Sequence, residues 1–195
     1  MSFLLHPKTE LCQPMTREEY LRLLYTARMH VNERLYLLIK VLGCTGIVLQ
    51  DMVKLTVEFL KGENETGKTA VQYDSINMPE LLKNELLQYT EKKNIVSGPV
   101  FITQSGKALD NSNILKGIRA LYKDAEINRN STRAMEFNML YYQTFTKLQE
   151  NMGPLAELAY NELLKQEEDL IGWNDGSLYY GSFQRSFGKI HEKQS

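Results

Sequence analysis

The sequence predicts a mostly helical α+β domain that carries one small antiparallel sheet. Apolar residues recur at helical spacing in the first quarter and in the last third of the chain. Between them lie short runs with the residue types and the turn signals of β-strands. Hydrophobic residues make up 43% of the 195 residues and charged residues 24%, which is the balance of a single globular domain.

The N-terminal part predicts two helices behind an extended leader. Residues 1–15 form the leader, because their two prolines disfavour a helix. Thr16-Arg17-Glu18-Glu19 has the spacing of a capping box, which predicts a helix over 17–30 with one apolar face. A second helix, capped by Asn32 and reaching about residue 42, is apolar nearly all round and therefore buried. A short helix is expected at 48–54.

In the middle of the chain the spacing changes to that of strands. Strands are expected over 55–60, 68–73 and 100–103, and a glycine-bounded turn at 62–67 joins the first two. A helix over 79–93, opened by its proline, separates the second strand from the third. These strands would form the small sheet.

The C-terminal half returns to a helical pattern. The cluster Asp110-Asn111-Ser112-Asn113 predicts the cap of a helix that runs to about residue 124. Helices are further expected over 132–150 and 154–170, with a weaker helical piece in 177–192.

Charge and cysteine content exclude several classes of protein. The 23 basic and 24 acidic side chains give a net charge of −1, so DNA binding would require a local basic face. Lys40 interrupts the longest apolar run, and no membrane span is expected. Cys12 and Cys44 have no CxxC spacing, which fits a reducing cytoplasm rather than a disulfide framework.

One motif suggests a nucleotide, and scattered histidines argue against a metal. Gly62-Glu63-Asn64-Glu65-Thr66-Gly67-Lys68-Thr69 matches the phosphate-binding P-loop, but that loop must be followed by a helix. The residues at 70–73 are strand-like, so a polar hairpin turn is the better interpretation. His6, His30 and His191 have no metal-ligand spacing. We therefore expect no nucleotide, metal or other cofactor.

Four stretches occur in an order and spacing typical of one protein family. They are 16–24, 32–38 continuing to Thr45-Gly46-Ile47, 55–58, and 97–103 followed by 105–110 and 112–114. Together they resemble the catalytic domain of the tyrosine site-specific recombinases, the phage integrase family. The resemblance is good over about 16–127 and weak over 128–195, and it implies one integrase-like domain over 16–195.

The resemblance implies a known chemistry. Two arginines of the family grip the scissile DNA phosphate and stabilise the charge that develops on it. A lysine on a β-hairpin and a histidine move protons, and a second histidine or tryptophan supports the phosphate. A tyrosine then forms a covalent 3′-phosphotyrosine, which a DNA hydroxyl later reverses.

This sequence departs from the family at most of those positions. The family motif Thr-Gly-Ile-Arg reads Thr45-Gly46-Ile47-Val48, so Val48 occupies the place of the first arginine. In the best alignment of the next motif, Phe137 replaces the histidine and Leu140 the second arginine. The Leu-Gly-His motif falls near 159–161. Apolar residues are the expected replacements once catalysis is abandoned, because buried arginines are costly without phosphate.

The remaining catalytic positions have only vestigial candidates. Lys68 follows a glycine as the hairpin lysine should, although an ungapped alignment reaches Gln72 instead. Tyr179 or Tyr180 could be the nucleophile, and Tyr180 is the candidate retained. Arg133 could replace the second arginine if catalytic residues have been relocated.

These departures leave three classes of function open. We expect a catalytically inactive recombinase-like protein related to DNA integration and recombination, which acts by protein contact or by DNA binding. The DNA contacts would be Lys107, Lys116, Arg119 and Lys123, of which the last three share one helical face. A second copy or an active integrase could dock on residues 177–195. The alternative is an active tyrosine recombinase with relocated catalytic residues.

Overall fold

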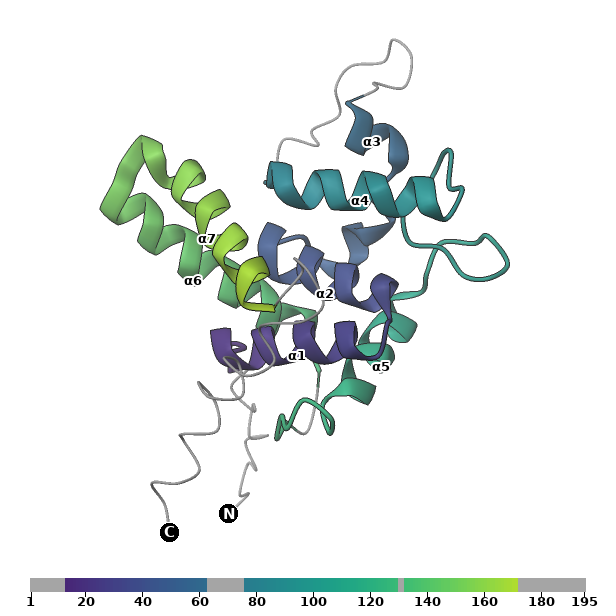
Figure 1. Cartoon of the computed structure of the whole chain (residues 1–195), viewed down its shortest axis with the longest axis horizontal. Coiled ribbons are helices and arrows are strands. Elements are labelled where there is room, and N and C mark those ends of the chain that lie inside the picture. Colours follow the sequence, from purple (N-terminus) through teal and green to yellow (C-terminus); the bar gives the residue numbers. More distant parts are fainter. Residues whose placement is uncertain (1–12, 63–75, 130–131, 172–195) are drawn as a thin grey trace, which may run out of the picture.

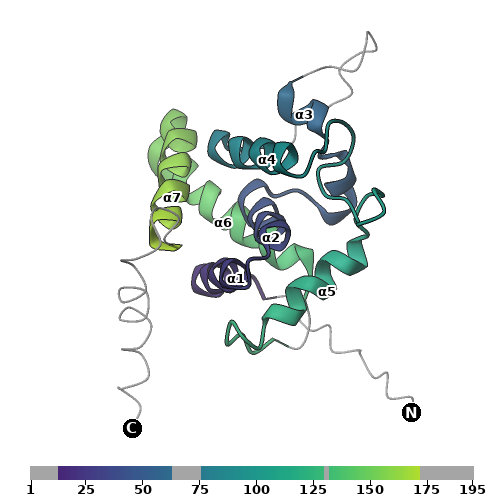
Figure 2. The ribbon, with the colours of Figure 1, turned by 45° about the vertical axis from the view of Figure 1, so that its right-hand side comes forward.

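The buried helix α2 (Glu33–Thr45) lies at the centre of the molecule, and the other helices pack around it. The computed structural model describes residues 13–62, 76–129 and 132–171. Every residue of α2 from Leu35 to Thr45 is buried, as its apolar sequence predicts. Figure 2 shows α2 nearly end-on, with α1 (Arg17–Met29), α4 (Glu80–Lys92) and α6 (Ala134–Met152) around it.

The first two helices begin where their caps predict. The amide of Glu19 donates to the hydroxyl of Thr16 (3.2 Å), and the amide of Thr16 donates to the carboxylate of Glu19 (2.9 Å). This is the predicted capping box. The side chain of Asn32 accepts from the amide of Leu35 (3.1 Å), which confirms the cap of α2. Both expectations depended on local hydrogen bonding alone.

The predicted strand over 55–60 is wrong. After the expected short helix, here a 3₁₀ turn η1 (Leu49–Lys54), the chain forms the short helix α3 (Val57–Lys61). The hydroxyl of Thr56 caps α3 by accepting from the amide of Phe59 (3.2 Å), and Gly62 ends it with a positive φ of 70°. A cap and a left-handed glycine six residues apart therefore outweigh the strand-like residue types.

No strand is present among the described residues, so the small sheet is unconfirmed. Two isolated antiparallel bridges join Thr56 to Pro99 and Ile102 to Ala108. The amide of Val100 donates to the carbonyl of Leu55 (2.9 Å), but the pairing stops there and 100–103 does not become a strand. The other predicted strand, 68–73, lies outside the described residues. The described fold is thus mostly helical.

The remaining predicted helices are confirmed. They are α4, α5 (Asn111–Leu121), α6, and α7 (Ala156–Ile171) with the 3₁₀ turn η2 (Gly153–Leu155) before it. The carboxylate of Asp110 caps α5 through the amide of Ser112 (2.7 Å). Figure 1 shows α6 and α7 as a hairpin on one side of α2 and α5 on the other. The predicted piece 177–192 lies outside the described residues, and no described helix is long and apolar enough to cross a membrane.

An ionic network joins the central helix to two of its neighbours. The side chain of Lys40 on α2 is only 3% exposed, and its ammonium contacts Glu85 on α4 (2.6 Å) and Glu168 on α7. A second pair, Arg17 with Glu167, links α1 to α7. Removing one partner of a buried ion pair leaves an uncompensated charge and is strongly destabilising. The network therefore fixes α4 and α7 against α2.

Two carboxylates share this site, and they cannot both ionise freely. Burial and the neighbouring carboxylate of Glu168 raise the pKa of Glu85 to about 7. Burial alone would lower the pKa of Lys40, but Tyr36 and the two carboxylates raise it, so the ammonium stays charged. Near neutral pH, Glu85 is thus only partly ionised beside the charged ammonium of Lys40.

The raised pKa of Glu85 predicts that stability falls as the pH rises. Because Glu85 binds its proton more tightly in the folded chain, the free energy of unfolding should decrease between about pH 4.5 and about pH 7. In wild type this decrease should be on the order of 1 kcal/mol, and in Glu85→Gln it should be absent. Urea unfolding at both pH values measures it. Glu80→Gln, an exposed change on the same helix, is the control. Parallel pH profiles for wild type and Glu85→Gln would contradict the prediction.

The packing of α1 on α2 requires a glycine at position 43. A Cβ built on Gly43 would lie 2.4 Å from Cε2 of Tyr20, a fully buried ring. We expect Gly43→Ala to reduce the free energy of unfolding by about 1–3 kcal/mol, because the ring must shift. Gly117→Ala is the matched control, since its Cβ would meet only the end of Leu35 at 3.4 Å. If chemical unfolding gave the same loss of unfolding free energy for both variants, the close packing of Tyr20 on Gly43 would not be what requires a glycine.

Candidate functional site

The loop that follows α2 holds the position expected for the first catalytic arginine. The helix ends at Gly46, whose φ is 66°. The hydroxyl of Thr45 donates to the carbonyl of Val41 (2.8 Å) and accepts from the amide of Ile47 (3.2 Å), so the turn is fixed. Ile47 is buried, but Val48 is 48% exposed. A side chain at position 48 therefore points to the surface and not into the core.

The first half of α6 packs against this loop. The side-chain amide of Asn138 donates to the carbonyl of Ile47 (2.6 Å). A Cβ on Gly46 would lie 2.5 Å from Cδ1 of Tyr141 and 3.2 Å from Cζ of Tyr142, so the two segments touch directly. The structure thus brings together the two segments that the sequence analysis expected to carry the catalytic arginines.

The alignment also placed Tyr141 at the next histidine of the motif, and Tyr141 does touch the loop, whereas Phe137 and Leu140 do not face it. Phe137 is fully buried and Leu140 is 5% exposed, and both belong to the core. Asn138, Tyr141 and Tyr142 reach the loop instead. The single polar residue in an apolar run, Asn138, was the signal that could have identified this face, because a buried amide requires a bonding partner.

Aromatic rings fill the space beside the loop. The ring of Tyr141 stacks on Phe145 (centroids 5.6 Å apart) and meets Tyr160 of α7 edge-on (5.8 Å). The hydroxyl of Tyr160 donates to the carbonyl of Cys44 (3.1 Å), and the hydroxyl of Tyr141 accepts from Asn77 (3.2 Å). The position expected for the Leu-Gly-His motif therefore lies inside a helix that continues to Ile171.

The site beside the loop is electrically neutral. Val48, Asn138 and Tyr142 carry no charge, and burial raises the pKa of Tyr141 and of Tyr160, so both phenols stay protonated at neutral pH. Arg133, the proposed replacement arginine, is exposed at the N-cap of α6, and its side chain has no hydrogen bond or ion pair within the described residues. The uncharged side chains against the loop can pack, but they supply no positive charge to balance a phosphate.

The four predicted DNA contacts lie on α5 and in the turns before and after it. Lys116 and Arg119 project from the exposed side of α5, whose opposite side is buried, and Lys123 follows in the next turn. Lys107 is exposed in the turn before α5. No one of the four forms an ion pair within the described residues. We call Lys107, Lys116, Arg119 and Lys123 the α5 basic face.

Other predicted residues have different outcomes. Lys68, Gln72, Tyr179 and Tyr180 lie outside the described residues, as does the P-loop-like motif after Gly62. Within the described part of the chain, no group of three or more histidine, cysteine or acidic side chains is placed to hold a metal ion. His30 instead contacts Asp124 (3.4 Å) at the surface.

Comparison with solved structures relates the fold to a recombinase. The crystal structure of XerA recombinase superimposes with a TM-score of 0.56 at 19% sequence identity, over 94% of this chain. The chain spans 66% of the length of that protein. No protein-family model matches the chain, and no curated protein sequence matches it significantly. The described chain therefore has a recombinase-like fold.

Substitutions at Asn138 and Val48 should differ in their cost to stability, because Asn138 makes a buried hydrogen bond and Val48 lies at the surface. Asn138→Ala leaves the carbonyl of Ile47 without its partner and should cost about 1–3 kcal/mol in the free energy of unfolding. Val48→Arg places a charge at a half-exposed position and should change stability by less than about 0.5 kcal/mol. Thermal and urea unfolding measure both. A severely destabilised Val48→Arg would contradict the placement of this side chain.

Proposed function

We propose that the chain is a non-catalytic recombinase-like protein of DNA integration and recombination, which binds duplex DNA through the α5 basic face. One observation carries the proposal: four exposed cations without acidic partners lie on α5 and its flanking turns, on a recombinase-like fold whose expected catalytic loop has no cation against it. Because the net charge of the chain is −1, DNA affinity would have to come from such a local set of basic side chains.

The loss of catalysis follows from the groups beside the loop. Phosphoryl transfer requires preorganised positive charge where charge develops, and one lost donor typically costs about 10²–10³ in rate. The side chains against the loop are Asn138, Tyr141 and Tyr142, and no cation stands among them. Phe137 and Leu140 are core residues, so neither can be exchanged for an arginine without burying its charge.

The geometry of α5 suits a phosphate backbone. Ile114 and Ile118 anchor one side of the helix in the core, which directs Lys116 and Arg119 outward. Lys116 and Arg119 are three residues apart on the exposed side of α5, and Lys123 lies in the turn that follows the helix. The α5 basic face can therefore contact several phosphates at once.

A protein partner is the second candidate function, and one observation favours it. The tip of the α6–α7 hairpin exposes Met152, Leu155 and Leu158, the last at 69%. Clustered exposed apolar side chains commonly mark a protein contact. Another copy of the chain or an active integrase would be such a partner, and this contact is compatible with DNA binding at α5.

The DNA-binding proposal predicts a salt-dependent affinity. Fluorescence anisotropy with a labelled duplex should show a steep loss of affinity between about 50 mM and about 200 mM salt. Lys116→Gln with Arg119→Gln should reduce the slope of log K against log salt by about two, since each lost phosphate contact removes about one. Lys147→Gln with Lys165→Gln, exposed on the hairpin, is the charge-matched control. No binding at low salt would refute the proposal.

A nicked suicide substrate tests the absence of catalysis in the same preparations. We expect no covalent protein–DNA adduct on a denaturing gel. An adduct that disappears in Tyr180→Phe would instead establish an active recombinase with relocated catalytic residues. DNA binding with no adduct is the outcome that supports the proposed function.

A further inference from the structure

We propose that a groove beside Arg34 binds a phosphodiester of the same DNA and so extends the α5 basic face across α2 toward α4. The inference rests on the proposed function and adds a site that the sequence analysis did not identify. Four segments that are far apart in the sequence form the groove: the start of α2, the end of α4, the turn at 103–107 and the first half of α5.

The groove consists of two adjoining hollows with polar walls. The first has a volume of about 600 Å³ and lies between α2 and α5. The second, of about 630 Å³, extends to Lys93 at the end of α4 and to His30. Asn32, Arg34, Thr103 and Gln104 line both hollows, so the two are continuous. Arg34 therefore stands at the middle of one track and not at its edge.

Arg34 is anchored but not neutralised. One terminal nitrogen of its guanidinium donates to the carbonyl of Ile102 (3.0 Å). Its remaining N–H groups have no partner within the described residues, and no described carboxylate pairs with it. A planar guanidinium with parallel free donors matches the oxygens of a phosphate, and its fixed orientation lowers the entropic cost of binding.

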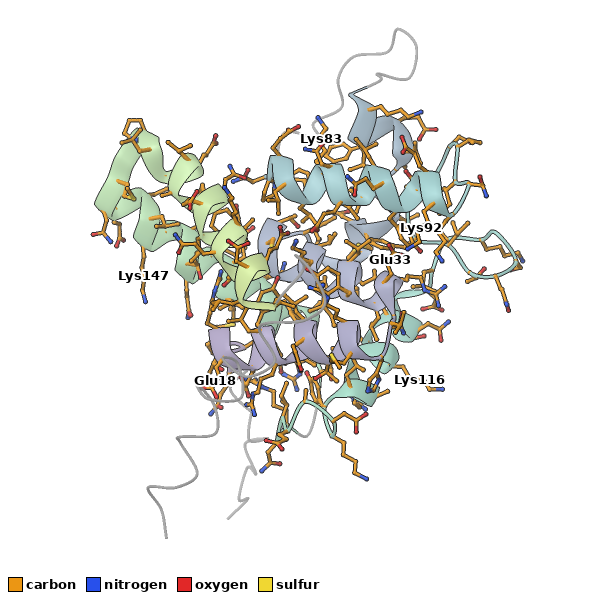
Figure 3. All side chains as sticks on the ribbon, in the orientation of Figure 1. Glu18, Glu33, Lys83, Lys92, Lys116 and Lys147 are labelled. Atoms are coloured by element: carbon orange, nitrogen blue, oxygen red, sulfur yellow. The ribbon has the colours of Figure 1, made fainter. Side chains whose placement is uncertain are left out.

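The lining of the groove carries the basic Arg34 and Lys93 and the acidic Glu33, and its His30 contacts Asp124 (3.4 Å). Arg34, Lys93 and Lys116 form no ion pair within the described residues. The acidic side chain in the groove, Glu33, is neutralised by Lys92 (3.0 Å). Figure 3 shows Glu33, Lys92 and Lys116 along one edge of the molecule, with Lys147 on the opposite side. An anion on this edge therefore meets a locally positive field, although the net charge of the whole chain is −1.

The turn before α5 joins the groove to the α5 basic face. The amide of Thr103 donates to the carbonyl of Lys107 (2.7 Å), and the amide of Lys107 donates to the hydroxyl of Thr103 (3.2 Å). Gly106, with a φ of 79°, closes the turn. These bonds hold the backbone of Lys107 beside the wall residue Thr103, so the turn that carries the Lys107 side chain adjoins the groove.

The test compares the salt dependence of duplex binding for variants of Arg34. Arg34→Gln should weaken binding several-fold at low salt and reduce the slope of log K against log salt by about one. Arg34→Lys should keep the slope, because it keeps the charge while losing the forked geometry. Lys147→Gln, which removes one charge on the opposite side, should leave both affinity and slope unchanged.

The outcomes distinguish a failure of the groove proposal from a failure of the proposed function. If Arg34→Gln binds DNA as wild type does while the α5 variants are weakened, the groove proposal is overturned and the proposed function stands. If wild type binds no duplex at low salt, both fail. A lower melting temperature in Arg34→Gln with an unchanged slope would show that the bond to Ile102 is only structural, which also overturns the groove. A slope lowered by about one in Arg34→Gln and restored in Arg34→Lys supports it.

Discussion

The architecture depends on one buried charge, the ammonium of Lys40 in the middle of an otherwise apolar helix. A lysine in this position is tolerated only because Glu85 and Glu168 contact it, and each of these carboxylates belongs to a different helix. Apolar packing alone would allow α4 and α7 to slide on α2, since hydrophobic contact has little direction. The ion contacts remove that freedom, and Arg17 with Glu167 does the same between α1 and α7. The α6–α7 hairpin is thereby held where α6 meets the loop after α2.

At that meeting point a recombinase would concentrate positive charge. In this chain, the side chains that touch the loop there are uncharged. Asn138 satisfies a loop carbonyl, and the hydroxyl of Tyr160 satisfies another at Cys44. Arginines gathered around an absent phosphate would repel one another, whereas these contacts are complete in the free protein. The cations of the chain have been divided instead between internal ion pairs, such as that of Lys40, and an exposed edge. Under the proposed function, stability and DNA contact would thus be served by different residues.

The sequence predicts those features that depend on neighbours along the chain. The capping box at Thr16 and the caps at Asn32 and Asp110 were predictable, because the interacting groups lie within three residues. The helix after Thr56 was missed, because its residue types favour a strand and only the cap and the glycine decide otherwise. The contact of Asn138 with the loop could not be predicted, because its partner, the carbonyl of Ile47, lies 91 residues away in the sequence. The groove beside Arg34 could not be predicted, because its walls come from four separated segments.

In the proposed complex, the two kinds of cation contribute differently. Lys116 and Lys123 are exposed side chains that must lose rotamer freedom when they meet a phosphate, so they contribute mainly attraction that salt screens. Arg34 has already lost part of that freedom to its bond with the carbonyl of Ile102, and its position among Asn32, Thr103 and Gln104 gives a phosphate one geometry. The lysines would therefore set how strongly DNA is attracted, whereas Arg34 would set where the strand lies. Under the proposed function, a recombinase-like fold without the charges for cutting DNA would still position it, with Arg34 as one preoriented contact within a broader field of positive charge.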